Sequence, residues 1–71
     1  MVYVIEIIKS KRTIINAYKK DQMGVEYACA DDLESKEAAI QLIRNRWKHN
    51  GVIHLIENNT KTIIIEGIKN G

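Results

Sequence analysis

The sequence predicts an α+β fold with the element order βββαββ, in which one helix packs on one face of a mainly antiparallel sheet. Three observations predict this class. Segments rich in β-branched residues lie near both ends of the chain, one amphipathic helical segment lies between them, and no repeat or linker divides the sequence. Since 71 residues have room for only one hydrophobic core, we expect a single domain over residues 1–71.

Three predicted strands precede the helix. In the first two, the odd-numbered residues such as Ile5 and Ile15 fall on one side, and the even-numbered residues fall on the other. Polar breaks separate the strands, and Gly24 in the second break is suited to a left-handed turn. The predicted strands are Val2–Lys9, Thr13–Tyr18 and Val25–Ala30, and the breaks are Lys9–Arg12 and Lys19–Gly24.

The helix is predicted between Ser35 and the pair Asn50–Gly51. The Ser35 hydroxyl is placed to accept hydrogen bonds from the free N–H groups of the first turn, and Asn-Gly supplies a left-handed stop. Acidic residues precede the helix and basic residues close it, as the helix dipole favours. Its apolar side comprises Ala39, Ile40, Ile43 and Trp47, with Leu42 at the margin.

Two further strands are predicted after the helix, at Val52–Glu57 and Lys61–Glu66. The residues between them, Asn58–Thr60, favour a tight hairpin because asparagine tolerates the left-handed backbone conformation.

One helix is too narrow to cover a sheet of five strands. A helix of about 15 residues is roughly 22 Å long and 10 Å wide, whereas five strands about 4.8 Å apart span roughly 24 Å. The residues that we assign to the core, together with the helix, are Ile5, Ile7, Ile15, Tyr27, Cys29, Ile53, Leu55, Ile63 and Ile65. The apolar residues left for the opposite side are Val4, Ile8, Ile14, Tyr18, Ile56 and Ile64.

These six surplus residues predict a protein interface, because a small domain seldom exposes a large apolar patch and gains stability by association. We therefore expect a small non-enzymatic interaction module, homodimeric or docked on a protein partner through the sheet face or an edge strand. Abundant Ile, Lys and Asn, whose codons are AT-rich, favour a low-GC bacterium or one of its phages or mobile elements as the source. Our hypothesis for the module is an accessory or inhibitory protein of such a phage or mobile element. In the alternative interpretation, sheet twist and long Lys or Glu side chains cover these residues in a monomer.

Basic residues predict a second function, nucleic-acid binding. Lysines bind phosphate, and a two-stranded ribbon fits a major groove. Against this, the net charge is only +2, and a hairpin would divide the first five basic residues between its two ends. The residues of this alternative are Lys9, Lys11, Arg12, Lys19, Lys20, Arg44, Arg46 and Lys48.

The segment Leu33–Ala39 resembles the strand-to-helix junction of arm-type DNA-binding domains of tyrosine recombinases, and is similar to that of small bacterial ββαββ domains. The resemblance covers seven of 71 residues, and the two strands after the helix depart from the recombinase pattern. Helix capping by itself accounts for such a junction, so the sequence assigns no family.

The sequence predicts no catalytic, cofactor or metal site. His49 and His54 lie on either side of the predicted helix end, and Cys29 lies in an apolar strand, where burial makes a thiol unreactive. We also expect no small-molecule substrate, no signal peptide and no membrane span. A single cysteine favours the reducing cytoplasm.

Overall fold

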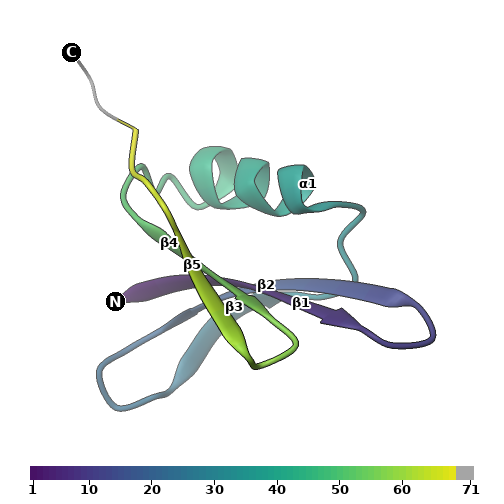
Figure 1. Ribbon diagram of the computed structural model, residues 1–71. Helices are drawn as coiled ribbons and strands as arrows, with labels where there is room; N and C mark the ends of the chain where they lie inside the picture. Colours follow the sequence, from purple (N-terminus) through teal and green to yellow (C-terminus); the bar gives the residue numbers. More distant parts are fainter. Residues whose placement is uncertain (69–71) are drawn as a thin grey trace.

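The computed structural model describes residues 1–68 and has the predicted α+β class, with a five-stranded sheet and one helix (Figure 1). The helix begins as an α-helix and ends in a π-helical turn, here η1. The elements are β1 (Val2–Lys9), β2 (Thr13–Lys20), β3 (Glu26–Ala30), α1 (Lys36–Gln41), η1 (Leu42–Arg46), β4 (Ile53–Glu57) and β5 (Lys61–Ile65).

Strand β1 lies at the centre of the sheet, in which the strand order is β3-β2-β1-β4-β5. Three of the four strand pairs are antiparallel, and only β1 and β4 are parallel. Since β3 ends at one edge and β4 lies beyond β1, the connection between them must cross the sheet. Helix α1 forms this crossing and packs on β1 and β2.

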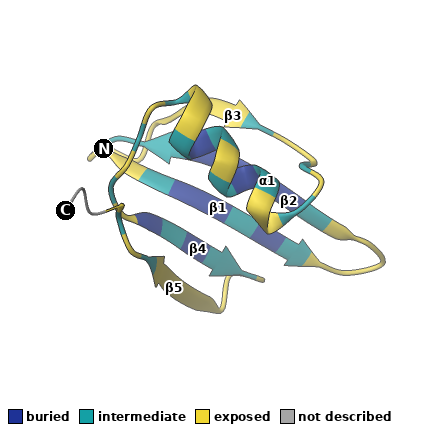
Figure 2. Ribbon diagram, turned by 90° about the horizontal axis from the view of Figure 1, so that it is seen from above, coloured by how far each residue is buried: buried dark blue, intermediate teal, exposed yellow. Residues whose placement is uncertain are grey.

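The hydrophobic core lies between α1 and the helix-facing side of the sheet (Figure 2). Ile5, Ile43 and Ile53 are its largest fully buried side chains, one each from β1, η1 and β4. The expected alternation is confirmed, because the odd-numbered residues of β1, β2 and β4 supply the sheet side of the core. The buried members are Ile5, Ile7, Ile15, Ala17, Ala39, Ile43, Ile53 and Leu55.

Three residues that the sequence assigned to the core are exposed instead. Ile63 is 37% exposed, because α1 lies over β1 and β2 and leaves the β5 side uncovered (Figure 2). Tyr27 is 43% exposed on the edge strand β3, and Cys29 is also exposed. The β2–β3 register shifts near Ala28, which has a φ of 50°, and this bulge breaks the alternation on which both assignments relied.

The helix begins as predicted but ends earlier. Ser35 is its N-cap, and the Ser35 hydroxyl accepts a 3.0 Å hydrogen bond from the Ala38 N–H. The predicted stop at Asn50–Gly51 is wrong, because the chain takes its left-handed conformation at Lys48, where φ is 56°. The π-helical turn widens the last turn, and the Trp47 N–H bonds to the Leu42 carbonyl at 3.0 Å.

Both predicted left-handed turns are confirmed. Gly24 has a φ of 85°, and Asn58 and Asn59 have φ values of 50° and 59° in the β4–β5 hairpin. The Asn58 side-chain oxygen also accepts a 2.7 Å hydrogen bond from the N–H of Lys9, at the end of β1. This turn therefore reverses the chain between β4 and β5 and also bonds to the end of β1.

The Asp21 carboxylate organises the turn between β2 and β3. It accepts hydrogen bonds from the N–H groups of Met23 and Val25, both at 2.9 Å, and from the Tyr27 hydroxyl at 3.0 Å. These bonds hold the pKa of Asp21 below its usual value, with the Val25 N–H as the largest cause.

Replacing the helix residue at the centre of the core should destabilise the protein strongly. Ile43→Ala removes a fully buried side chain, so we expect the free energy of unfolding to fall by about 3 kcal/mol. Urea denaturation followed by circular dichroism measures this loss. Met23→Ala, at a largely exposed turn residue, is the control and should change stability by less than about 0.5 kcal/mol. Equal effects of the two variants would contradict this core.

The Asp21 turn predicts a pH dependence of stability. Because the pKa of Asp21 is lower in the folded state, its stabilisation is complete above the unfolded pKa near 3.8 and is lost as the pH falls through the folded value. The stability difference between the wild type and Asp21→Ala should therefore shrink below pH 3.8. Urea denaturation from pH 2 to 7 measures it, with Asp31→Ala as the control. A difference that grows on acidification would show that the sign is wrong.

Candidate functional site

The candidate site is the side of the sheet opposite α1, which we call the open face. Strand register arranges its side chains in three rows that cross the strands. The rows are Tyr18–Val4–His54–Ile64, Asn16–Glu6–Ile56–Thr62, and Ile14–Ile8. All six residues predicted to form the interface therefore lie on one face of the sheet.

The protein itself covers two of these six residues. Val4 is only 4% exposed, because the larger Tyr18 and His54 flank it in its row. Tyr18 is 9% exposed, and the Lys20 ammonium lies 5.9 Å from the centre of its ring. This arrangement agrees in part with the alternative in which long side chains cover the face. The remaining four residues, Ile8, Ile14, Ile56 and Ile64, keep exposed surface.

Polar groups interrupt the apolar surface at its centre. Glu6 lies between Asn16 and Ile56 in the middle row and is half-buried. Burial raises the pKa of the Tyr18 hydroxyl, and the nearby negative charges of Glu6 and Glu26 raise it further. Tyr18 therefore remains a neutral hydrogen-bonding group at physiological pH, beside a carboxylate.

The open face also contains four polar residues that are absent from the predicted interface: Glu6, Asn16, His54 and Thr62. Their even numbers in β1, β2, β4 and β5 were the available signal, since strand alternation places them beside the predicted apolar residues. Hydrophobicity alone does not select polar residues, so the interface predicted from the sequence lacked them.

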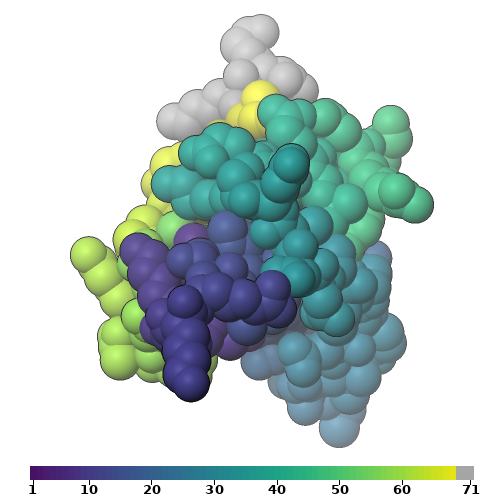
Figure 3. Space-filling view, turned by 90° about the vertical axis from the view of Figure 1, so that its right-hand side faces the viewer, coloured from purple at the N-terminus to yellow at the C-terminus, as the bar shows by residue number. Residues whose placement is uncertain are grey.

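The residues of the nucleic-acid alternative do not form one surface. Lys9, Lys11 and Arg12 lie at the β1–β2 hairpin tip, whereas Lys19 and Lys20 lie at the far end of β2, about 23 Å away. In Figure 3 the hairpin tip projects below the helix, and the turn after β2 lies to one side of it. Lys19 and Lys20 are also directed to opposite faces of the sheet, over the rings of Tyr3 and Tyr18.

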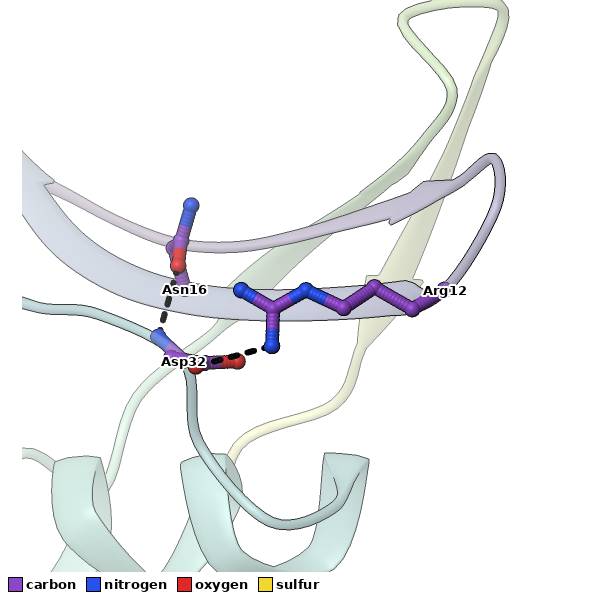
Figure 4. A network of polar contacts seen from close by, with 3 residues as sticks. All are labelled: Arg12, Asn16 and Asp32. Atoms are coloured by element: carbon purple, nitrogen blue, oxygen red, sulfur yellow. Dashed lines mark hydrogen bonds and ion pairs between the residues drawn. The ribbon is translucent and has the colours of Figure 1, made fainter.

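Arg12 at the hairpin tip is paired with an acidic residue. Its Nη1 atom lies 3.3 Å from Asp32 Oδ2, and the Asp32 N–H donates a 2.9 Å hydrogen bond to the Asn16 side chain (Figure 4). Both charged groups are exposed, so the ion pair adds little stability. The Asp32 carboxylate does offset one of the three positive charges of the tip that phosphate binding would use.

Arg44 has a structural role. Its guanidinium donates hydrogen bonds to the backbone carbonyls of His49 at 3.1 Å, Gly51, and Glu66 at 3.0 Å. These carbonyls belong to the loop before β4 and to the segment after β5. One side chain therefore joins η1 to the loop before β4 and to the segment after β5. By contrast, Arg46 and Lys48 are exposed.

An aromatic cluster lies where the helix ends. The rings of Tyr3 and His49 stack 3.7 Å apart, and the Trp47 ring lies 6.4 Å from Tyr3. Trp47 is half-buried against the core, in agreement with its predicted place on the apolar side of the helix. His49 packs on Tyr3 and its Nε2 atom lies 3.0 Å from the Val52 carbonyl, whereas His54 lies on the open face.

Residues 1–68 enclose no pocket. No three His, Cys, Asp or Glu residues of the described chain are grouped so that they could hold a metal ion. None of the helical segments in these 68 residues is long and apolar enough to cross a bilayer.

Comparison with models of protein families, with curated proteins and with solved structures gives no match to this chain.

Replacing Arg44 should lower stability even when the charge is kept. In Arg44→Lys a single ammonium replaces the guanidinium fork that reaches three carbonyls, so we expect a loss of about 1–2 kcal/mol in the free energy of unfolding. Urea denaturation measures the loss. Arg46→Lys, two residues further on and exposed, is the matched control and should be neutral. The structural role of Arg44 would be refuted if both variants were as stable as the wild type.

Proposed function

We propose that this protein is a small non-enzymatic interaction module that docks on another protein surface through its open face. The observation that supports the proposal is the partial exposure of four isoleucines, Ile8, Ile14, Ile56 and Ile64, on a sheet face that no helix of the described chain covers. Apolar surface gathered on one side of a small domain is typical of contact sites.

The shape of the open face supports a protein partner. It is a sheet surface, broad in two directions, and the exposed isoleucines are spread over β1, β2, β4 and β5. Such a face is suited to a flat, apolar partner surface, such as another sheet face or the apolar side of a helix.

The polar centre of the face indicates what the partner must supply. Docking would bury the Glu6 carboxylate, and a buried carboxylate is costly unless a cation or several N–H or O–H donors bind it. We therefore expect an apolar partner surface with a basic or donor group opposite Glu6. Asn16, His54 and Thr62 offer further hydrogen-bonding groups around that position.

The proposal places the protein in the cytoplasm, as an accessory or inhibitory protein of a phage or mobile element. Nucleic-acid binding is the competing hypothesis. The dispersal of the basic residues and the use of Arg44 within the fold make it the weaker one. Because phosphate contacts release counterions, that function would weaken steeply with salt, whereas apolar docking would not.

A pair of substitutions on the open face tests the proposal. Ile14→Thr with Ile56→Thr removes apolar surface but keeps β-branched residues in both strands. Immobilised wild-type chain in a lysate of its source cells should retain a specific protein, either a second copy or another chain. The double variant should retain it at least about tenfold less well, which is a loss of about 1.4 kcal/mol.

Ile68→Thr is the matched control, since Ile68 is exposed but lies beyond β5 and outside the sheet. Circular dichroism and urea denaturation show whether the variants are folded. Equal retention by the wild type and the double variant would contradict docking through this face. Binding to random DNA that falls steeply between two salt concentrations, and that the double variant keeps, would support the nucleic-acid hypothesis instead.

A further inference from the structure

Strand β5 forms an edge of the sheet. Its backbone is regular, and most of its side chains are apolar. It pairs with β4 over all five of its residues without a register shift, and nothing in the order of the sheet lies beyond it. Its sequence is Lys-Thr-Ile-Ile-Ile, and Ile63 and Ile64 are 37% and 47% exposed on opposite faces. Such an edge presents unpaired N–H and C=O groups together with residues of high β propensity.

The opposite edge of the sheet is protected in ways that β5 is not. In β3 the register shifts beside Ala28, whose positive φ breaks the regular spacing of N–H and C=O groups. The chain beyond β3 continues along β2, where the Leu33 N–H bonds to the Ile15 carbonyl at 2.7 Å. Bulges and covering segments are how proteins prevent unwanted strand pairing. β5 has a single lysine, at its first residue.

We propose that β5 pairs antiparallel with β5 of a second copy of the chain, so that two five-stranded sheets join into one of ten strands. Full overlap of the two strands requires that Ile63 of one copy lies opposite Ile63 of the other. Thr62 then lies opposite Ile64, and Lys61 lies opposite Ile65. A two-fold axis perpendicular to the sheet relates the copies, so both helices lie on the same side.

The charges of β5 favour this antiparallel arrangement. Lys61 begins the strand and Glu66 directly follows it. Antiparallel pairing therefore keeps the two Lys61 residues at opposite ends of the joint, each one residue along the strand from Glu66 of the other copy, although the two side chains lie on opposite faces of the sheet. A parallel pair would instead place the two Lys61 residues side by side. Within each copy Lys61 lies opposite Glu57 in the register with β4, so opposite charges are also neighbours there.

The dimer would extend the open face across both copies. Ile64 ends the row Tyr18–Val4–His54–Ile64, and Thr62 ends the row Asn16–Glu6–Ile56–Thr62. Because Ile64 of each copy would lie opposite Thr62 of the other, pairing would join the first row of one copy to the second row of the other. Since the contact is only five residues long, about 17 Å, we expect a weak and concentration-dependent dimer.

Introducing a charge in place of Ile63 tests the pairing. Sedimentation equilibrium of the full chain from about 10 µM to about 1 mM should show a reversible monomer–dimer equilibrium. Ile63→Lys and Ile63→Glu each place like charges opposite each other, so each should raise the dimer Kd at least about tenfold. An equimolar mixture of the two variants should recover a heterodimer, because lysine then faces glutamate.

Ile68→Lys is the control for an added charge outside the strand and should leave the Kd unchanged, and circular dichroism verifies that every variant is folded. A wild type that stays monomeric over the whole range, or a variant mixture that does not associate, would overturn the pairing. So would self-association that Ile14→Thr with Ile56→Thr abolishes and the Ile63 variants leave intact, since the copies would then meet through the open face. The inference does not rest on open-face docking, which fails separately if the double variant keeps its partner protein.

Discussion

The crossing from β3 to β4 is the constraint on which the structure depends. β3 is an edge strand, and β4 lies on the far side of the central strand β1 and runs parallel to it. Because β3 and β4 also run in the same direction, the connection must return along the length of the sheet over one face. Residues 1–68 contain one helix for this purpose. The other face is consequently left without a covering layer in the described protein.

Polar bonds as well as apolar packing hold that crossing in place. Ile43 anchors the helix in the core, and Arg44 beside it binds the carbonyls that lead into β4 and out of β5. The π-helical turn contains both residues. Adjacent residues of a helix point about 100° apart, so one residue reaches the core while the next reaches the loops. A residue that looks like a nucleic-acid contact in the sequence is thus part of the framework.

The same constraint divides the surface into parts with different properties. The open face is apolar with a polar centre, and Val4 and Tyr18 are already covered by neighbouring side chains of the protein. The two edges also differ, since a bulge interrupts β3 whereas β5 is regular and rich in isoleucine. The partly apolar face and the unprotected edge are the two surfaces that the proposed associations would use.

The sequence by itself determined the elements with local causes: the strands from β-branched alternation, the helix start from Ser35, and the turns at Gly24 and Asn58–Asn59. It also grouped the six apolar residues of the open face, because alternation is a property of each strand. Only the tertiary structure decided the parallel β1–β4 pair, the early helix end at Lys48, and the exposure of Tyr27, Cys29 and Ile63. Those features depend on which strands become neighbours and on where one helix lies across them, and such long-range contacts leave no local pattern in the chain.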